Sequence, residues 1–531
     1  MSPATSAPRA VNHWLVAAAV VIPAFMEVLD TTIANVALRY IAGGLSAANV
    51  DSEWVITSYL AANAIVLPMS GWLLNRLGRR KYFLLSIAGF TLSSLMCGLA
   101  ANLEQLVAAR ILQGLAGGGL QPCSQGILLD SFPKEKQGQG LTVFAIAALV
   151  APVVGPTLGG YITDNYSWRW IFFINIPVGC VALLACSSLV QDPPYLIAER
   201  AKGKKNPTPF DSIGLGLLII VMVCWEVVLS KGQEWDWFGD PFYRVQVLTG
   251  LFTFGLIGLV VRELTTAAPL VNLRPLADRS FTIGAIVIAC AYAALYGQTT
   301  SLPALLQTLF GYDATHSGLV LSPAGVFSVM MLPIVGILLG RGVDARWLIM
   351  IGLGFMAVGN YWLAQMTLDI GPWQVVWVRV VLIVGLSILF APLNVAVYRN
   401  IPLHLRGAAV GLFSLVRNEG GSVGTSVAQT IEERREQFHL LRLNEYLDGF
   451  NPALTNYLAG LRPGLAAIFG DPTASDQLGY QIIDNIRQAQ AASLAYFDVF
   501  WVFAVVSALL TPLVLLMRPA VAEKGAHLAA D

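Results

Sequence analysis

Charged residues are scarce in this 531-residue chain, where they make up 12% of the sequence while hydrophobic residues make up 56%. Soluble proteins carry about 25% charged residues, so this scarcity excludes an ordinary soluble domain. Lys and Arg together number 32 and are matched by 32 Asp and Glu, so the net charge is zero. Nucleic acid binding depends on a surplus of basic side chains, and the sequence therefore gives no sign of a nucleic acid partner.

Cysteine and histidine are also rare, with six and five residues, and they are scattered along the chain. The sequence contains no Cys-x-x-Cys pair and no clustered histidines that could complete a metal site. It also lacks a Gly-x-Ser-x-Gly turn and a phosphate-binding loop. These absences argue against a metal cofactor and against a membrane-embedded enzyme, and we interpret the cysteines as small buried hydrophobic residues.

Long hydrophobic runs, in contrast, cover most of the chain. A helix needs about 20 apolar residues to cross a bilayer core about 30 Å thick, and the sequence accommodates fourteen such spans. The first span lacks the small-residue cleavage site of a signal peptide, so we expect it to be retained. The predicted spans are 14–36, 54–74, 82–101, 104–128, 141–163, 169–190, 212–230, 243–263, 281–303, 317–340, 346–366, 374–398, 407–430 and 496–517.

The distribution of basic residues predicts the orientation of these spans. The two terminal tails and alternate loops hold 20 of the 32 Lys and Arg residues, whereas the loops on the opposite side hold nine. By the positive-inside rule both termini are cytoplasmic, which agrees with an even number of spans. The long segment 431–495 is then external, and its apolar residues recur at helical spacing, so we expect it to be folded.

A weak internal repeat relates the two ends of the chain. Residues 71–76 read Gly-Trp-Leu-Leu-Asn-Arg, and residues 336–341 read Gly-Ile-Leu-Leu-Gly-Arg. Arg110 and Arg379 are each followed by a proline twelve or thirteen residues later. Both matches align if the last six spans repeat the first six. Such a repeat of six helices is typical of transporters that bind their substrate between two halves. The predicted units are an N-terminal half (1–190), linkers with an inserted helix pair (191–280), a C-terminal half (281–517) that includes 431–495, and a cytoplasmic tail (518–531).

Four sequence motifs resemble those of the major facilitator superfamily, and more narrowly its fourteen-helix drug:proton antiporters of the EmrB/QacA type. The resemblance implies an all-α integral membrane fold with two six-helix halves and an inserted pair, no cofactor, and the proton motive force as the energy source. Two positions depart from the usual motifs, because Arg39 stands in place of Pro and Asn75 in place of Asp. The motifs are LDTTIANVAL (29–38), GWLLNRLGRRK (71–81), RILQG (110–114) and GPTLGG (155–160).

Two of these motifs are expected to act in gating. In the motif at 155–160, glycine lets helices approach closely and proline bends them. These residues alone fit ordinary membrane packing, whereas the resemblance to the antiporter motif implies a gating interface. The basic loop after the second span is at least a positive-inside anchor, and the resemblance implies a cytoplasmic latch. The gating candidates are Gly71, Arg76, Gly78, Arg79, Gly155, Pro156, Gly159 and Gly160.

Ionisable residues inside spans are candidates for proton coupling. Inserting one at the centre of a membrane helix costs about 2.5–3.5 kcal/mol, so we expect such a residue to have a function. Glu27 and Asp30 are three residues apart and share a helix face. The helical rise places Asp30 and Arg110 at similar depths in the first and fourth spans. We predict that Asp30, tuned by Glu27 and Arg110, is the principal proton carrier; a structural ion pair is the alternative. The family resemblance implies a role for Arg110 in proton transfer.

Other polar residues within spans are candidates for a substrate cavity. Glu419 lies near the middle of the thirteenth span, where a carboxylate suits a cationic substrate or a second proton. Glu226 lies near the end of the seventh span and could simply reach water. The remaining side chains would line a cavity or form hydrogen bonds between helices. The cavity candidates are Glu419, Asn63, Gln125, Tyr292, Gln298 and Asn394.

These features together lead us to expect a proton-coupled antiporter that exports amphipathic drugs or other toxic organic compounds across the bacterial inner membrane by alternating access. A transporter of a specific metabolite or lipid-like solute on the same fold, or a non-transporting scaffold or sensor, is the alternative. The expected partners are the lipid bilayer, protons and a small-molecule substrate. The resemblance also implies that segment 431–495 contacts a periplasmic adaptor and an outer-membrane channel.

Overall fold

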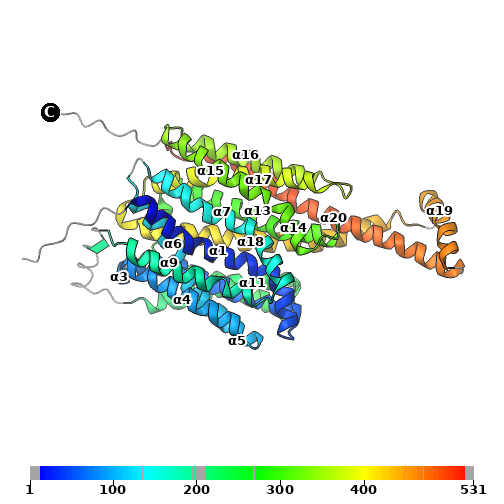
Figure 1. The fold of residues 1–531 in the computed structure, drawn as a ribbon, viewed down its shortest axis with the longest axis horizontal. Helices are drawn as coiled ribbons and strands as arrows, with labels where there is room; N and C mark the ends of the chain where they lie inside the picture. The colour runs from blue at the N-terminus through cyan, green and yellow to red at the C-terminus, as the bar shows by residue number, and fades with distance from the viewer. Residues whose placement is uncertain are drawn as a thin grey trace, which may run out of the picture.

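The computed structural model describes residues 12–520 except 134–135, 194–195, 198–209, 267–268, 449 and 470–471. All regular secondary structure in these residues is helical, and the helices form an elongated bundle (Figure 1). The predicted all-α fold is confirmed. Residues 198–209 of the predicted linker unit (191–280) and the tail beyond Ala520 fall outside the described residues.

Each of the first six predicted spans corresponds to one helix or to two helices that meet at a short break. Their bounds differ from the predicted ones, mostly by a few residues, and polar side chains cap the start of two of them. Asn12 and Asn102 accept hydrogen bonds from the backbone N–H groups of Trp14 (3.0 Å) and Gln105 (2.9 Å). The helices are α1 (His13–Gly44), α3 (Trp54–Leu77), α4 (Arg79–Leu99), α5 (Leu103–Gly117) with α6 (Leu120–Ser131), α7 (Gln137–Asn165), and α8 (Trp170–Phe173) with α9 (Asn175–Leu189).

The remaining eight spans are also helical. Two of them form the predicted inserted pair, α11 (Ser212–Lys231) and α12 (Arg244–Thr265). The other six, with the additional helix α19 (Pro452–Phe469), make up the C-terminal part of the bundle. They are α13 (Arg279–Thr308), α14 (Ala314–Leu321) with α15 (Pro323–Gly340), α16 (Ala345–Ala364), α17 (Pro372–Tyr398), α18 (Arg406–Asn444) and α20 (Pro472–Leu513).

Eleven helices of the described chain are long and apolar enough to cross a membrane, or twelve if the bent halves of α7 count as one span. The two predicted spans outside this set are α5–α6 and α18. Helices α5 and α6 are individually short, with 15 and 12 residues. The polar residues of these segments, such as Arg110, Gln121 and Arg417, are buried within the bundle. Helix α5 also keeps an apolar outer face at Ile111, Leu112 and Leu115, so these two segments fit the fourteen-helix class of the fold.

The helices within each predicted half pack mainly against one another. In the N-terminal half α1 packs against α7 and α9, and in the C-terminal half α13 packs against α18 and α16 against α17. Helices α15, α16 and α17 lie on one side of the bundle and α3, α4 and α5 on the other (Figure 1). Helix α11 contacts both α3 and α18, so the inserted pair touches each half. The domain boundaries themselves stay a prediction.

The two ends of the bundle differ in structure. At one end, here called the turn end, α3 passes into α4 through Gly78 alone, whose φ of +86° favours glycine. At the opposite end, here called the α19 end, α18 and α20 continue past the predicted span limits. Helix α20 has 42 residues, a length of roughly 63 Å. The segment 431–495 is thus largely helical, with α19 packed on α20 at the far end (Figure 1).

The loop between α11 and α12 is fixed by Asp240. Its carboxylate accepts hydrogen bonds from the Arg244 side chain (3.0 Å) and from the backbone N–H groups of Arg244 (2.7 Å) and Phe242 (3.1 Å). These bonds lower the pKa of Asp240 from its ordinary value of 3.8 to about 2, and the bond with the Arg244 side chain has the largest effect. The folded state therefore favours the carboxylate, and this stabilisation is present at neutral pH and lost only as the pH falls through about 2.

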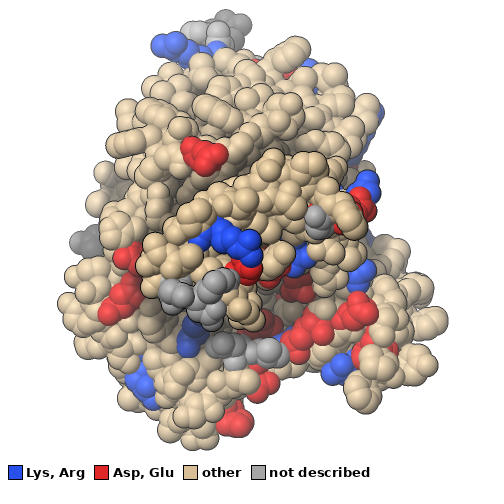
Figure 2. All heavy atoms as spheres, turned by 90° about the vertical axis from the view of Figure 1, so that its right-hand side faces the viewer, with Lys and Arg blue, Asp and Glu red and all other residues tan. Residues whose placement is uncertain are grey.

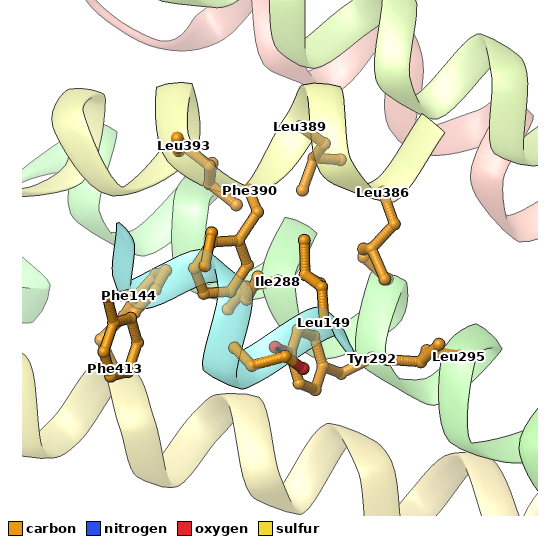
Figure 3. Close-up of a cluster of buried hydrophobic side chains, with 14 of the residues drawn as sticks. Phe144, Leu149, Ile288, Tyr292, Leu295, Leu386, Leu389, Phe390, Leu393 and Phe413 are labelled. Atoms are coloured by element: carbon orange, nitrogen blue, oxygen red, sulfur yellow. Dashed lines mark hydrogen bonds between the residues drawn. The ribbon is translucent and has the colours of Figure 1, made fainter. Parts of the chain in front are cut away.

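The two halves meet in an apolar cluster on the turn-end side of the bundle centre. Phe144 of α7 stacks against Phe390 of α17 with ring centroids 6.3 Å apart, and Tyr292 of α13 lies 6.2 Å from the same ring (Figure 3). All three side chains are buried. The cysteines are mostly buried as expected, but Cys180 on α9 is exposed, because the outer face of a peripheral membrane helix contacts no other helix.

Candidate functional site

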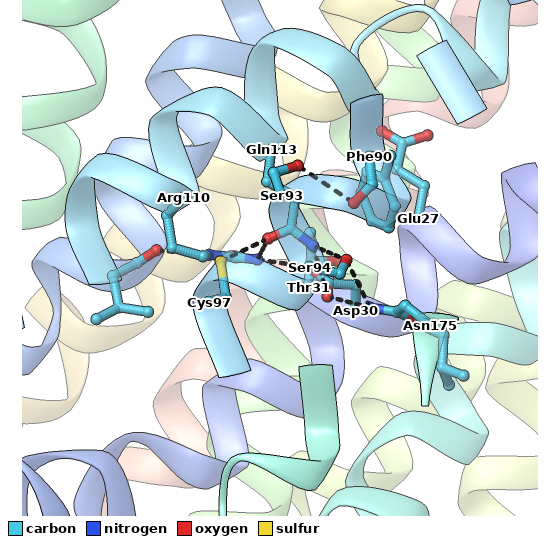
Figure 4. A network of polar contacts seen from close by, with 12 residues as sticks. Glu27, Asp30, Thr31, Phe90, Ser93, Ser94, Cys97, Arg110, Gln113 and Asn175 are labelled. Carbon is cyan, nitrogen blue, oxygen red and sulfur yellow. Dashed lines mark hydrogen bonds and ion pairs between the residues drawn. The ribbon is translucent and has the colours of Figure 1, made fainter. Parts of the chain in front are cut away.

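Asp30 and Arg110 form a buried ion pair in the centre of the N-terminal half. Arg110 Nη1 lies 2.5 Å from Asp30 Oδ2, and both side chains are at most 1% exposed. The other carboxylate oxygen, Oδ1, accepts hydrogen bonds from Gln113 (3.1 Å) and Asn175 (2.7 Å). The structure therefore brings Asp30 and Arg110 together, as their similar depths predicted, and surrounds the carboxylate with three donor side chains from α5 and α9 (Figure 4).

Arg110 is held in place from several directions. Its Nε donates to the backbone carbonyl of Val55 (3.0 Å), and Nη1 also donates to Gln113 (2.7 Å). The guanidinium lies 4.2 Å from the centroid of the Tyr59 ring and 5.7 Å from that of Phe172. Such contacts favour a permanent positive charge in a buried place. Because they come from α3, α5 and α8, a change in the charge of Asp30 would be felt by several helices.

Glu27 lies in a different environment from Asp30, although the two share a helix. Asn63 donates to Glu27 Oε1 (2.9 Å). The other oxygen, Oε2, has no partner with hydrogen-bond geometry among the described residues, although the Gln121 side chain is close to the carboxyl group. Figure 4 shows the Glu27 side chain turned away from the Asp30 network. Glu27 lines a cavity, and Asp30 does not. Tyr59 lies between the two groups, since it lines the cavity and stacks on Arg110.

The cavity lies between the two halves, toward the α19 end. Its walls come mainly from residues 27–38 of α1, 53–63 of α3, 226–230 of α11 and 418–429 of α18. The charged residues that line it are Glu27, Glu53 and Glu226, and all three are acidic. Figure 2 looks onto the α19 end and shows acidic side chains grouped near its centre. The arrangement favours a cationic or neutral guest over an anion.

Of the six residues that the sequence nominated for the cavity, the structure places Asn63 in its wall. The others lie elsewhere: Gln125 donates to Asn394 (2.5 Å) between the halves, and the Tyr292 hydroxyl is 3.5 Å from the carbonyl of Ala148. Glu419 faces Glu226 behind the wall. Residues one or two positions apart on a helix point in different directions, so depth alone could not assign these side chains to the cavity.

Gln298, the last of these candidates, belongs to a counterpart of the Asp30 network in the C-terminal half. Arg379 Nη1 donates to Gln298 Oε1 (2.9 Å), and Gln298 donates to Asn360. Arg379 on α17 repeats Arg110 on α5, as the sequence repeat suggested, and Gln298 on α13 occupies the role of Asp30 on α1. The C-terminal half thus has a neutral amide where the N-terminal half has a carboxyl group.

The glycines of the fifth span allow α7 to approach α1 closely. A Cβ atom at Gly155 would lie 2.7 Å from Thr32 Cβ, and one at Gly159 would lie 3.2 Å from Ile33 Cγ2. Pro156 and Gly160 are buried in the same helix. The same spacing recurs in α18, where added Cβ atoms at Gly420 and Gly424 would collide with the α13 backbone. The sequence reasoning missed this second Gly-x-x-x-Gly pair, although its spacing matches the first.

We expect Gly155→Ala to destabilise the protein, because the new methyl group would force α1 and α7 apart at Thr32, whose β-branched side chain cannot turn away freely. The expected loss is about 1–3 kcal/mol, measured as a lower melting temperature in detergent. Gly216→Ala on α11 is the matched control, since nothing lies within 4 Å of its added Cβ and alanine favours a helix. Equal melting temperatures for the two variants would contradict this packing role.

The remaining gating candidates lie at the turn end. Arg79 pairs with Asp130 of α6, and Arg406 at the start of α18 lies 3.6 Å from the same carboxylate, so Asp130 links the two halves. A Cβ atom at Gly71 would lie 2.9 Å from the backbone nitrogen of Ala408. Arg76, in contrast, is exposed and lies 6.0 Å from the Trp72 ring. The halves are thus in contact at this end. The departure at Asn75 lies outside the described side chains, and Arg39 is exposed.

Comparison with known proteins agrees with this geometry. Residues 20–425 match the family model of the Major Facilitator Superfamily. The chain is 35% identical over 504 residues to the multidrug export protein EmrB of Escherichia coli (strain K12), covering 93% of each chain. It is also 35% identical over 498 residues to the fatty acid resistance protein FarB of Neisseria gonorrhoeae, covering 93% of this chain and 94% of that one.

Solved structures give the same result for the fold. The human organic anion transporter MFSD10 (TETRAN) superimposes with a TM-score of 0.59 at 12% sequence identity, covering 94% of this chain and 99% of that one. A similarity at this identity concerns the fold alone. From its family match, its relatives and its helical architecture, the chain belongs to the major facilitator superfamily, within the group similar to EmrB-type drug:proton antiporters.

Proposed function

We propose that this protein is a proton-coupled antiporter that exports amphipathic organic compounds across the bacterial inner membrane. The observation that carries the proposal is the pairing of an acid-lined cavity between the halves with a buried Asp30–Arg110 ion pair behind its wall. The cavity offers a place for the substrate, and the ion pair offers a carboxyl group that can change its protonation state. Tyr59 separates them by a single side chain.

The acidic lining of the cavity supports amphipathic cations as the preferred substrates. Glu27, Glu53 and Glu226 surround a space whose other walls include apolar and aromatic side chains such as Leu60 and Tyr296. Multidrug export in the EmrB relative fits such a site. The FarB relative, named for fatty acid resistance, gives a second candidate class. A fatty acid anion would be repelled by Glu27 and Glu226 unless they were protonated, whereas Glu53 is paired with Lys231. The fatty acid class is therefore the second choice.

Alternating access is supported by the repeat and by the contacts at the turn end. Each half contains close glycine contacts between its helices, among them α1 with α7 and α13 with α18, so each half can move as a unit. At the turn end the halves meet through side-chain and backbone contacts, such as Asp130 with Arg406 and Gly71 with the backbone of Ala408. Rocking of the halves would break these contacts and close the cavity toward the α19 end.

Proton coupling rests on the difference between the two arginine networks. Both Arg110 and Arg379 are buried and bonded to the first helix of their half, but Asp30 can bind a proton at its carboxylate and Gln298 cannot. Protonation of Asp30 would remove the partner of a buried guanidinium that does not itself titrate. The resulting rearrangement of α1 and α5 is the step that we assign to coupling, with Glu27 as the carboxyl group that faces the cavity.

A growth-inhibition panel tests the proposed function. An efflux-deficient bacterial host that expresses this protein should grow at higher concentrations of amphipathic cations such as ethidium than the same host with an empty vector. Long-chain fatty acids form the second arm of the panel. Protection against fatty acids alone would favour the second candidate class, and no protection against any compound would overturn the proposal of export.

The segment at the α19 end is proposed to be periplasmic and to contact an adaptor of an outer-membrane channel. It carries exposed apolar side chains, among them Leu441, Phe450 and Ile468, to which an adaptor is proposed to bind. A self-packed cap is the alternative. We expect a cysteine at Leu458 to be labelled by an impermeant reagent in intact cells, whereas one at Lys204, outside the described residues, should stay unlabelled.

Deletion of residues 450–485 tests the docking role separately. We expect the shortened protein to transport normally in liposomes but to lose resistance in cells with an outer membrane, because only the second situation needs a partner. Full resistance in such cells, with the protein folded and present in normal amount, would remove the docking role. The labelling experiment would still report the orientation, since it depends on neither transport nor a partner.

A further inference from the structure

The inserted helix α11 contributes a buried carboxyl group to the cavity. Glu226 is 2% exposed and is one of the residues that line the cavity. Ser422 of α18 donates a hydrogen bond to its Oε1 (3.1 Å), whereas Oε2 has no partner with hydrogen-bond geometry among the described residues. Because α11 packs against both α3 and α18, this carboxyl group lies where the insert meets the two halves.

Glu419 of α18 lies directly beside Glu226. The two carboxyl groups interact with each other, and Trp225 is also close to Glu419. Both Glu419 oxygens are buried, yet neither meets hydrogen-bond geometry with a described group. The structure therefore holds two facing acids with three carboxyl oxygens that lack a fixed donor. A proton shared between the two groups would satisfy part of this deficit.

Nearby charged groups do not neutralise the pair. Arg417, two residues before Glu419, donates to Gln121 and lies 5.5 Å from the centroid of the Tyr292 ring. Lys231 lies 2.7 Å from Glu53 and 2.6 Å from Glu234. The third acid of the cavity wall, Glu27, accepts from Asn63 on the other side. Among the described residues no Lys or Arg forms an ion pair with Glu226 or Glu419.

We propose that Glu226 and Glu419 form a second proton-binding site, in which one proton is shared between the two carboxyl groups and is exchanged with the cavity through Glu226. This inference rests on the proposed antiporter function and extends it to two protons per cycle. Two buried carboxylates in contact cannot both be charged without a large electrostatic cost, so one proton stays with the pair. The Ser422 hydrogen bond stabilises the charge on Glu226, which leaves the proton on the Glu419 side.

The site couples to the substrate through the cavity wall. An organic cation near Glu226 would offset the repulsion between two charged carboxyl groups and thereby favour release of the shared proton. A proton arriving from the α19 end would have the opposite effect and favour release of the cation. Substrate and proton therefore compete at this pair as well as at Asp30. The inserted helices then take part in transport, since α11 supplies one of the two acids.

Transport of ethidium in liposomes tests the proposal. Exchange of two protons for one monovalent cation moves one net charge, so a membrane potential alone should drive transport by the unaltered protein. The double variant Glu226→Gln, Glu419→Gln should exchange one proton for one cation, and should respond to a pH gradient but lose its response to a potential. The same Glu→Gln change at the exposed Glu445 is the matched control and should keep both responses.

A second measurement does not depend on ethidium being a substrate. Infrared difference spectra of the protein in liposomes report protonated carboxyl groups as the pH is varied, and the double variant should show one such group fewer than the unaltered protein. In the single variant Glu226→Gln, the remaining acid Glu419 should bind its proton at a lower pH than in the unaltered protein, because its like-charged neighbour is gone. A double variant with the full infrared signal, or with an undiminished response to potential, would overturn the proposal. If the unaltered protein showed no proton-driven transport at all, that result would instead refute the antiporter function.

Discussion

Asp30→Asn should abolish transport driven by a proton gradient while the protein stays folded. Asparagine has nearly the same shape as aspartate and can still accept hydrogen bonds from Gln113 and Asn175. It carries no charge and cannot bind and release a proton, however, so the ion pair with Arg110 is lost and nothing at this position responds to pH. We expect the purified variant in liposomes to bind ethidium but to show no uptake coupled to a pH gradient.

The matched control for this experiment is Asp369→Asn, the same chemical change at an exposed residue between α16 and α17. The control should transport normally. Ethidium efflux along its own concentration gradient should persist in Asp30→Asn, which separates coupling from access to the cavity. Gradient-driven transport by Asp30→Asn at the rate of the unaltered protein would assign coupling to another carboxyl group, with Glu27 as the next to test.

Arg110→Gln should destabilise the protein strongly and also abolish transport. Removal of one partner from a buried ion pair leaves the other charge uncompensated, which costs about 3–5 kcal/mol. Asp30 would then keep Gln113 and Asn175 as neutral donors but would lack a cation. The stacking on Tyr59 would be lost as well. The measurement is the melting temperature in detergent, together with gradient-driven ethidium transport in liposomes.

A double variant separates the two effects of Arg110. In Asp30→Asn, Arg110→Gln no charge is left unpaired, so we expect much of the lost stability to return while transport remains absent. Arg110→Lys keeps the charge but loses the Nε donor that binds the backbone carbonyl of Val55. This variant should therefore retain only part of the transport rate. If the double variant were as unstable as Arg110→Gln alone, the ion pair would not be the source of the destabilisation.

The sequence predicts the fold well, because membrane helices must be long and largely apolar. It also predicts that Asp30 and Arg110 meet, since a fixed rise per residue converts sequence position into depth. The spans that correspond to α5–α6 and α18 were also predicted from apolar windows of about 20 residues, although these helices are not among those long and apolar enough to cross a membrane singly. The extension of α18 and α20 beyond the bilayer length was not foreseen, because hydropathy marks only the part of a helix that lies in lipid.

The composition of the cavity wall could not be read from the sequence. It depends on the rotation of each helix about its axis, and that rotation is set by packing against neighbours that lie far away in the chain. Glu27 and Asp30 show this limit, because they share a helix but reach different surroundings. Glu226 and Glu419 show it also, since residues of the insert and of α18 meet only when α11 packs across the seam between the halves.

Simultaneous recording of proton and ethidium flux in liposomes tests the central claim most directly. The account predicts that an inward proton gradient drives ethidium out against its own gradient, with protons entering in fixed proportion to the ethidium that leaves. The proportion should fall when Glu226 and Glu419 are both replaced by glutamine. Coupling should vanish in Asp30→Asn, because protonation of Asp30 is the step that rearranges α1 and α5, and the second proton can cross only with that rearrangement. Ethidium export that proceeds with no accompanying proton flux in the unaltered protein would contradict the account.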